Sequence, residues 1–285
     1  MVYLEIPKMS EHPVEKGIAG VVRTYELMDR VRMRQDLVIR DDQFDHEALL
    51  DAVRYAGRRR IRLSLLDTGR FDLAQVEALA RGGARILTSD DVRPRADEWE
   101  ILVEAGRRGG THLCVLWNGP LPAAAVSGPT LQALEDLLAR GMDFHISDRT
   151  HPRDAGSLAG LAAAARKGKA YFVLTHIGPL VADLAGPAGH RAWVHFSDAA
   201  IADEPGAALA VEIARAAADA GSRAVVHIER GLPLELLEGL WAAGAALVFL
   251  TPPSDDRSLL RPIERRALRR KLPARAFYLS TAFLP

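Results

Sequence analysis

Short apolar runs alternate along most of the chain with longer amphipathic stretches rich in alanine and leucine. The runs are rich in valine, isoleucine, leucine and phenylalanine and are almost continuously apolar, which is typical of parallel strands covered on both faces. Eight such runs are predicted as strands, at residues 61–66, 84–88, 111–117, 143–147, 170–175, 192–197, 224–228 and 246–250.

The stretches between these runs have the apolar periodicity of amphipathic helices, and most of them end at a glycine. Glycine is favoured at this point because the residue after a helix often takes a positive φ, which costs glycine little. The predicted helices lie at residues 73–81, 99–108, 131–140, 158–166, 207–220 and 234–243.

Strands that alternate with helices require crossover connections and therefore a parallel sheet. Eight strand–helix units predict an α/β fold of the (β/α)8 TIM-barrel type. Three further strand-like runs, at 2–6, 37–40 and 276–280, would add N- and C-terminal strands, and the alternative is an open doubly wound parallel sheet. We expect one domain over 1–285, in which 1–45 forms an N-terminal extension or cap.

The overall composition excludes several classes of protein. Thirty-seven basic residues balance 37 acidic ones, so no net charge attracts the chain to nucleic acid or to a membrane surface. Cys114 is the only cysteine, which excludes an intramolecular disulfide and a multi-cysteine zinc site. No apolar run approaches the roughly 20 residues that cross a bilayer. We therefore expect a cytoplasmic protein, and the alanine-rich helices would also suit a homo-oligomer.

Polar side chains follow nearly every predicted strand, and four consecutive strands end in a histidine: His145, His176, His195 and His227. Ligands of parallel α/β folds bind at the carboxyl ends of the strands, so these imidazoles are candidates for one site. Side chains alternate between the two faces of a strand, which places His195 with Ser197 and His227 with Glu229. The alternative is that each histidine is a partly buried strand-end residue, hydrogen-bonded to a neighbouring loop.

These residues predict an acid–base site. His145, His195, His227 and Glu229 are the candidate catalytic groups. The candidates for substrate binding are Arg149 and Arg230, which would pair with an anionic group, and Trp117 and Asn118, which would line the pocket. His176 and Asp198 are the candidate ligands if the cofactor is a divalent metal ion. Trp117 could equally pack beneath a loop.

The predicted function is that of a barrel enzyme acting on a small, polar, anionic substrate. Its chemistry would be acid–base catalysis by histidine and carboxylate, or metal-assisted catalysis, as in an isomerase, a lyase or a hydrolase. The nucleotide-binding and hydrolase motifs G-x-x-x-x-G-K-[ST], G-x-G-x-x-G after a strand, H-E-x-x-H and G-x-S-x-G are absent. The alternative is a non-catalytic binding module or a subunit of a larger assembly.

Overall fold

The computed structural model describes residues 24–32, 37–122 and 129–249. The chain divides into two compact units, Met1–Phe144 and His145–Pro285, and each is described by itself. The predictions of a single domain over 1–285 and of a cap at 1–45 stay predictions.

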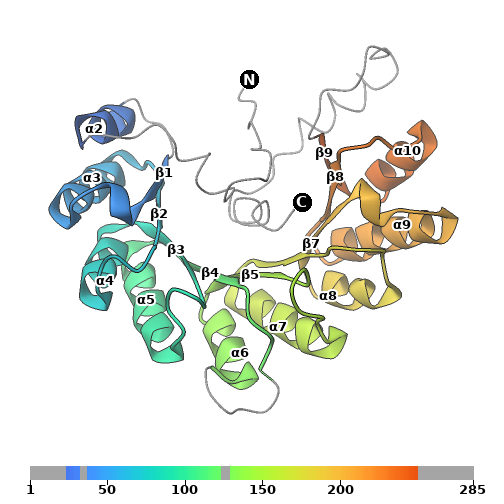
Figure 1. Ribbon diagram of the computed structural model, residues 1–285, viewed down its shortest axis with the longest axis horizontal. Coiled ribbons are helices and arrows are strands. Elements are labelled where there is room, and N and C mark those ends of the chain that lie inside the picture. The colour runs from blue at the N-terminus through green and yellow to red at the C-terminus, as the bar shows by residue number, and fades with distance from the viewer. Residues whose placement is uncertain (1–23, 33–36, 123–128, 250–285) are drawn as a thin grey trace. The chain divides into compact units, whose positions relative to one another are not determined.

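Unit 1 alternates helices with strands (Figure 1). Its described elements are α2 (Thr24–Arg32), β1 (Leu37–Arg40), η1 (Asp41–Gln43), α3 (His46–Arg59), β2 (Leu63–Leu66), α4 (Leu73–Gly82), β3 (Arg85–Ser89), α5 (Ala96–Gly109), β4 (Leu113–Trp117) and α6 (Leu131–Ala139).

Unit 2 continues the alternation. Strand β5 (Asp143–Ser147) leads into it, and α7 (Ala155–Gly168), β6 (Phe172–Thr175), η2 (Ala182–Leu184), α8 (Ala185–Gly189), β7 (Trp193–Ser197), η3 (Asp198–Ala200), α9 (Glu204–Asp219), β8 (Ala224–Ile228), α10 (Leu234–Ala242) and β9 (Ala246–Phe249) follow. None of the helices that the structure describes is both long enough and apolar enough to cross a membrane.

The strands form one sheet whose order follows the chain from β1 to β9. Neighbours from β1 to β4 and from β6 to β9 pair in parallel. In Figure 1 the helices of each unit lie on one side of its strands. This is the (β/α)8 barrel-like topology that the sequence predicted. The alternative of a doubly wound sheet is wrong, because such a sheet needs a reversal of the strand order.

All eight predicted strands are present, and the run at 37–40 is β1. The runs at 2–6 and 276–280 lie outside the described residues. The sequence analysis did not assign α3, which has an arginine-rich end. It has four buried residues, and the last three lie three, four and seven positions after the first. This spacing places all four on one apolar stripe of the helix. They are Leu49, Ala52, Val53 and Ala56.

Each unit has apolar layers of its own. In unit 1 the ring of Trp117 packs between Trp99, at a centroid distance of 5.9 Å, and Phe144, at 5.8 Å. In unit 2 a buried cluster joins one residue from each of four neighbouring strands: Val173, Trp193, Val225 and Ala246. Burial of these side chains gives the sheet its hydrophobic stabilisation.

The end of α5 approaches the end of α4 so closely that only glycine fits at Gly109. A Cβ atom at this position would lie 2.1 Å from the carbonyl oxygen of Ala80 and 3.1 Å from that of Arg81. Both neighbours are backbone atoms, so no side chain can turn away to make room.

We predict that Gly109→Ala lowers the free energy of unfolding by about 2 kcal/mol or more, because two helix ends must separate to admit the methyl group. Gly186→Ala is the control, since a Cβ there meets no atom within 4 Å. It should change the unfolding free energy by less than about 1 kcal/mol. Urea denaturation of the three proteins measures both values, and equal stability of the two variants would contradict the close approach.

Candidate functional site

Two aspartates of unit 1 each lie directly after a strand and bind the loop that follows the neighbouring strand. Asp41, directly after β1, accepts hydrogen bonds from the backbone N–H of Thr68 at 3.1 Å and from its hydroxyl at 2.5 Å. Asp90, directly after β3, accepts from the N–H groups of Asn118 at 2.8 Å and Gly119 at 2.7 Å. Burial raises the pKa of both carboxyl groups, although these hydrogen bonds act in the opposite direction.

Unit 2 repeats this arrangement twice. Asp148, directly after β5, accepts from the N–H of Ile177 at 2.7 Å. Asp198, directly after β7, uses one oxygen, Oδ2, to accept from three consecutive N–H groups after β8 at 3.2, 2.7 and 2.8 Å, those of Glu229, Arg230 and Gly231. Asp198 is buried, so its carboxylate ties the end of β7 to the loop after β8.

The repeat of these aspartates was not predicted from the sequence, where only Asp198 was a candidate. Its signal is a Ser-Asp pair at 89–90, 147–148 and 197–198, with Arg-Asp at 40–41. A second signal is a triplet ending in glycine after each alternate strand, at 67–69, 117–119, 176–178 and 229–231. In all four cases the N–H of the middle residue donates to the aspartate.

The imidazole of His176 lies between two acceptors. Its Nδ1 bonds the carboxylate of Asp148, and its Nε2 lies 2.9 Å from the carbonyl oxygen of Pro179. Both ring nitrogens must therefore donate, which requires the imidazolium form. Burial lowers the pKa of His176, but the hydrogen bond and charge of Asp148 and the Pro179 carbonyl outweigh it, and the pKa lies above its ordinary value.

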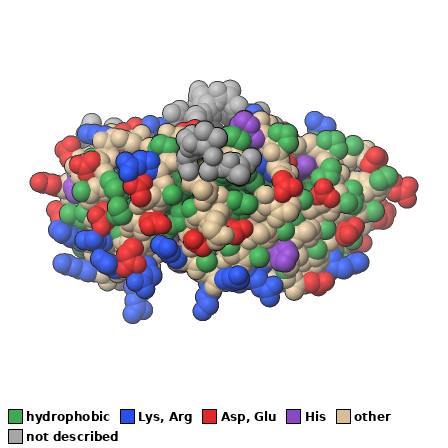
Figure 2. Space-filling model, turned by 90° about the horizontal axis from the view of Figure 1, so that it is seen from below, with side chains coloured by type: hydrophobic (Ala, Val, Ile, Leu, Met, Phe, Trp, Pro, Cys, Tyr) green, Lys and Arg blue, Asp and Glu red, His purple; other side chains and the backbone are tan. Residues whose placement is uncertain are grey.

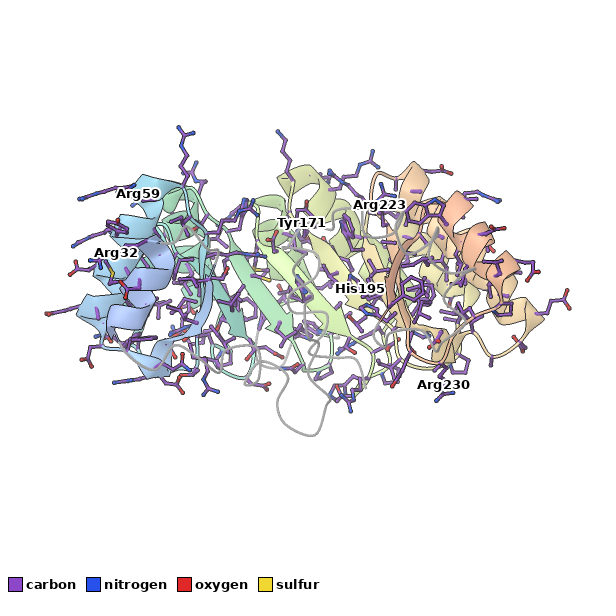
Figure 3. The ribbon with its side chains drawn as sticks, turned by 90° about the horizontal axis from the view of Figure 1, so that it is seen from above. Arg32, Arg59, Tyr171, His195, Arg223 and Arg230 are labelled. Atoms are coloured by element: carbon purple, nitrogen blue, oxygen red, sulfur yellow. The ribbon has the colours of Figure 1, made fainter. Side chains whose placement is uncertain are left out.

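Two of the predicted catalytic histidines contact each other. Nδ1 of His195 on β7 lies 3.1 Å from Nε2 of His227 on β8, and the ring centroids are 5.3 Å apart. Both side chains are completely buried. The register explains the contact: His195 lies opposite Val225, and His227 lies opposite Ser197, so both histidines project from the same face of the sheet. Figure 3 shows His195 among the strands of unit 2.

Polar and apolar side chains are layered around this pair. The hydroxyl of Thr175, which lies opposite His195 on β6, is buried and has no hydrogen-bond partner among the described residues. Two positions earlier on the same face, Val173 on β6 and Trp193 on β7 belong to the apolar cluster. The imidazole pair therefore lies on an apolar layer, beside a hydroxyl that can still bond a polar group.

Burial fixes the charge of His227. It lowers the pKa of His227 to about 3, so this imidazole is neutral at physiological pH. In a neutral imidazole one nitrogen donates and the other accepts. One proton therefore lies between Nδ1 of His195 and Nε2 of His227, and its position sets the tautomers of both rings.

The other predicted catalytic and charged residues are placed differently. His145 is buried in β5, and its membership of the site stays a prediction. Arg149, Glu229 and Arg230 have exposed side chains just after β5 and β8. Figure 3 shows Arg230 at the edge of unit 2 where its strands end. The charged groups are thus available at the surface, whereas the imidazoles lie within the unit.

The two residues predicted as the pocket lining belong to unit 1. Trp117 is buried in the aromatic cluster with Trp99 and Phe144, so its ring packs in the core. The side-chain amide of Asn118 donates to Asp91 at 2.6 Å, and its backbone N–H bonds Asp90. These contacts hold the loop after β4.

The metal site predicted at His176 and Asp198 stays a prediction, and both side chains make hydrogen bonds within unit 2. His176 has an oxygen acceptor at each nitrogen, and Oδ2 of Asp198 is bonded to three N–H groups. Within 24–32, 37–122 and 129–249, no three histidine, cysteine, aspartate or glutamate side chains are grouped so that they could hold one metal ion.

No family model matches the chain, and no curated protein matches it. Among solved structures, similarity was found to deoxyribose phosphate aldolase from Aeropyrum pernix, at 14% identity over 86% of this chain and 97% of that one, with a TM-score of 0.30. An HpcH/HpaI aldolase from Desulfitobacterium hafniense DCB-2 is 14% identical over 90% of this chain and 92% of that one, with a TM-score of 0.32. Likeness at this level carries no argument about the chemistry of this chain.

We predict that Asp198→Ala lowers the free energy of unfolding by about 2 kcal/mol, because three loop N–H groups lose their acceptor together. Asp219→Ala is the matched control, since this exposed carboxylate near the end of α9 makes no hydrogen bond or ion pair within the described residues. Thermal unfolding followed by circular dichroism compares the two. If Asp219→Ala lowers the stability as much as Asp198→Ala does, the role of Asp198 in holding the loop after β8 is contradicted.

His176 should make stability depend on pH. Its folded-state pKa is raised, so its contribution is complete below the unfolded pKa of about 6.5 and is lost as pH rises through the higher folded value. The difference in unfolding free energy between the protein and His176→Gln should therefore shrink as pH rises above about 6.5. Denaturant titrations at a series of pH values measure it, and a difference that grows over this range would refute the assignment of charge.

Proposed function

We propose that this protein is an enzyme that moves protons on a small, polar, anionic substrate, as a lyase or an isomerase. The observation that carries the proposal is the contact between His195 and His227 near the carboxyl ends of β7 and β8. These strand ends are where (β/α)8 enzymes bind their substrates. A buried residue with a strongly shifted pKa, such as His227, is a candidate for a functional site.

The pair can pass a proton without becoming charged. If Nε2 of His195 gives up a proton while Nδ1 of His227 gains one, the shared proton shifts between the two facing nitrogens and both rings stay neutral. This relay suits a fully buried site, because forming an imidazolium ion there is costly, as the pKa of about 3 for His227 indicates. A neutral N–H group can also polarise a substrate carbonyl.

Charged residues nearby suit an anionic substrate. Arg149 and Arg230 have exposed side chains just after β5 and β8, where guanidinium groups can bind a carboxylate or phosphate. Glu229 stands beside Arg230 and is the proposed carboxylate partner in acid–base chemistry. His145 would add a third imidazole. Both ring nitrogens of His176 are bonded to oxygen acceptors, which favours this chemistry over metal-assisted hydrolysis at that residue.

A non-catalytic binding module is the second candidate. It is favoured by the complete burial of both imidazoles together with the exposure of the charged strand-end residues, which would then form the binding surface. A homo-oligomer stays a prediction in either case.

Deuterium exchange tests the catalytic proposal. Incubated in D2O with a panel of 2-oxo acids and phosphorylated hydroxyketones, the protein should exchange a carbon-bound hydrogen of at least one compound, as followed by proton NMR. His195→Gln and His227→Gln should each slow this exchange by about a hundredfold or more, because removal of one ring interrupts the relay.

His190→Gln is the control, since His190 is exposed after α8. Circular dichroism establishes that all variants are folded, and a His195→Asn variant serves if Gln at that position unfolds the protein. Exchange that persists at the wild-type rate in folded His195 and His227 variants would sink the proposal. Absence of exchange with every compound, together with binding of one of them, would favour the binding module.

A further inference from the structure

A second candidate site lies at the opposite end of the strands of unit 2. A cavity of about 340 Å³ opens at the amino ends of β6, β7 and β8. Its lining includes Lys169, Tyr171, Arg191, Trp193, Ser222 and Arg223. Figure 3 shows Tyr171 and Arg223 toward one edge of the unit, Arg230 at the other, and His195 between them.

The three cations of the cavity lack acidic partners. Neither Lys169, Arg191 nor Arg223 forms an ion pair with any residue that the structure describes. The guanidinium of Arg223 donates to the carbonyl oxygen of Gly244 at 2.8 Å, which fixes its position at the cavity. Three positive charges without a counter-charge at one cavity create a field that attracts an anion.

Some of the basic residues at helix ends in unit 1 are paired with acidic residues. Basic residues are common there because they interact favourably with the helix dipole, and blue side chains gather along the lower edge of the left part of Figure 2, which contains α3 to α5. Arginines at the ends of α4 and α5 are paired: Arg81 bonds Glu77, and Arg107 and Arg108 bond Glu104. Among the described residues, the cations around the cavity form no ion pair, and the same holds for Arg58, Arg59 and Arg60 at the end of α3. What distinguishes Lys169, Arg191 and Arg223 is that they line one cavity.

Two of the cavity's cations have a left-handed backbone conformation. Lys169 has a φ of +56° and Arg191 a φ of +73°, and they are two of the three non-glycine residues with positive φ in the described ranges. This left-handed conformation costs most side chains energy, and glycine takes it freely. The third is Arg60, the C-cap of α3, and Lys169 is the C-cap of α7, so this conformation ends a helix in both units.

Two aromatic rings complete the lining. Tyr171 and Trp193 are tilted by 33° with centroids 5.9 Å apart, and Trp193 belongs to the apolar cluster beneath the cavity. Aromatic surface beside the cations suits the planar part of a ligand, which can stack on the rings while its charged group bonds the guanidinium groups. The volume lies within the range of small-molecule sites.

We propose that this cavity binds a small phosphorylated molecule, with the phosphoryl group on Lys169, Arg191 and Arg223 and a planar group against Tyr171 and Trp193. The site is separate from the imidazole pair, since it lies at the other end of the same strands. Its occupation does not depend on the proposed catalytic activity.

Isothermal titration calorimetry of the full chain with phenyl phosphate and pyrophosphate tests the proposal. Both probes should bind at low ionic strength, and Arg191→Gln should weaken each by about tenfold or more, because one charge-assisted contact is lost. Trp193→Phe should weaken phenyl phosphate more than pyrophosphate, since only phenyl phosphate has a ring to stack. Lys169→Gln gives a second charge-removing variant if Arg191→Gln fails to fold.

Arg215→Gln is the matched control, because this exposed arginine of α9 does not line the cavity. If Arg215→Gln weakens binding as much as Arg191→Gln does, the affinity reflects the overall charge of the protein, and this result would overturn the proposed site. Failure of both probes to bind the folded protein would also overturn it. Binding of a single-stranded RNA oligonucleotide, with no binding of either probe, would overturn it too, because the cations would then bind a polymer.

Discussion

The carboxyl ends of the strands depend on one interaction, in which a buried or half-buried aspartate accepts the backbone N–H groups of the loop after the next strand. Loop N–H groups that leave a parallel sheet need acceptors, since an unpaired buried donor costs free energy. Asp41, Asp90, Asp148 and Asp198 supply them after alternate strands. The same interaction occurs twice in each unit, so the fold is built from repeated pairs of strand–helix units.

This interaction also positions the candidate site. Asp198 joins the end of β7 to the loop after β8, and these two strands carry His195 and His227. The parallel register places the imidazoles on one face, and the aspartate holds together the strand ends beyond them. The neutral state of His227 follows from its burial, so fold and chemistry share a physical cause.

The sequence predicted the fold well, because continuous apolar runs, helical periodicity and terminal glycines are local signals. The strands at 61–66 and 143–147 needed no tertiary information. The sequence predicted that the four histidines lie at one site, but it did not predict the contact between two of them. It could not be predicted further, since the spacing of His195 and His227 fixes neither the register nor the rotamers that bring two rings to 3.1 Å. The role of Trp117 in the core of unit 1 depends equally on packing partners distant in sequence.

Imidazole nitrogen NMR tests the central claim most directly. In protein labelled with 15N at histidine, two-bond correlation spectra followed from neutral pH downward report the protonation of each ring nitrogen. The account predicts that His227 stays neutral until the pH approaches its pKa of about 3, or until the protein unfolds, with Nδ1 of His195 and Nε2 of His227 sharing one proton. Titration of His227 in the folded protein near the ordinary histidine pKa of about 6.5 would contradict it.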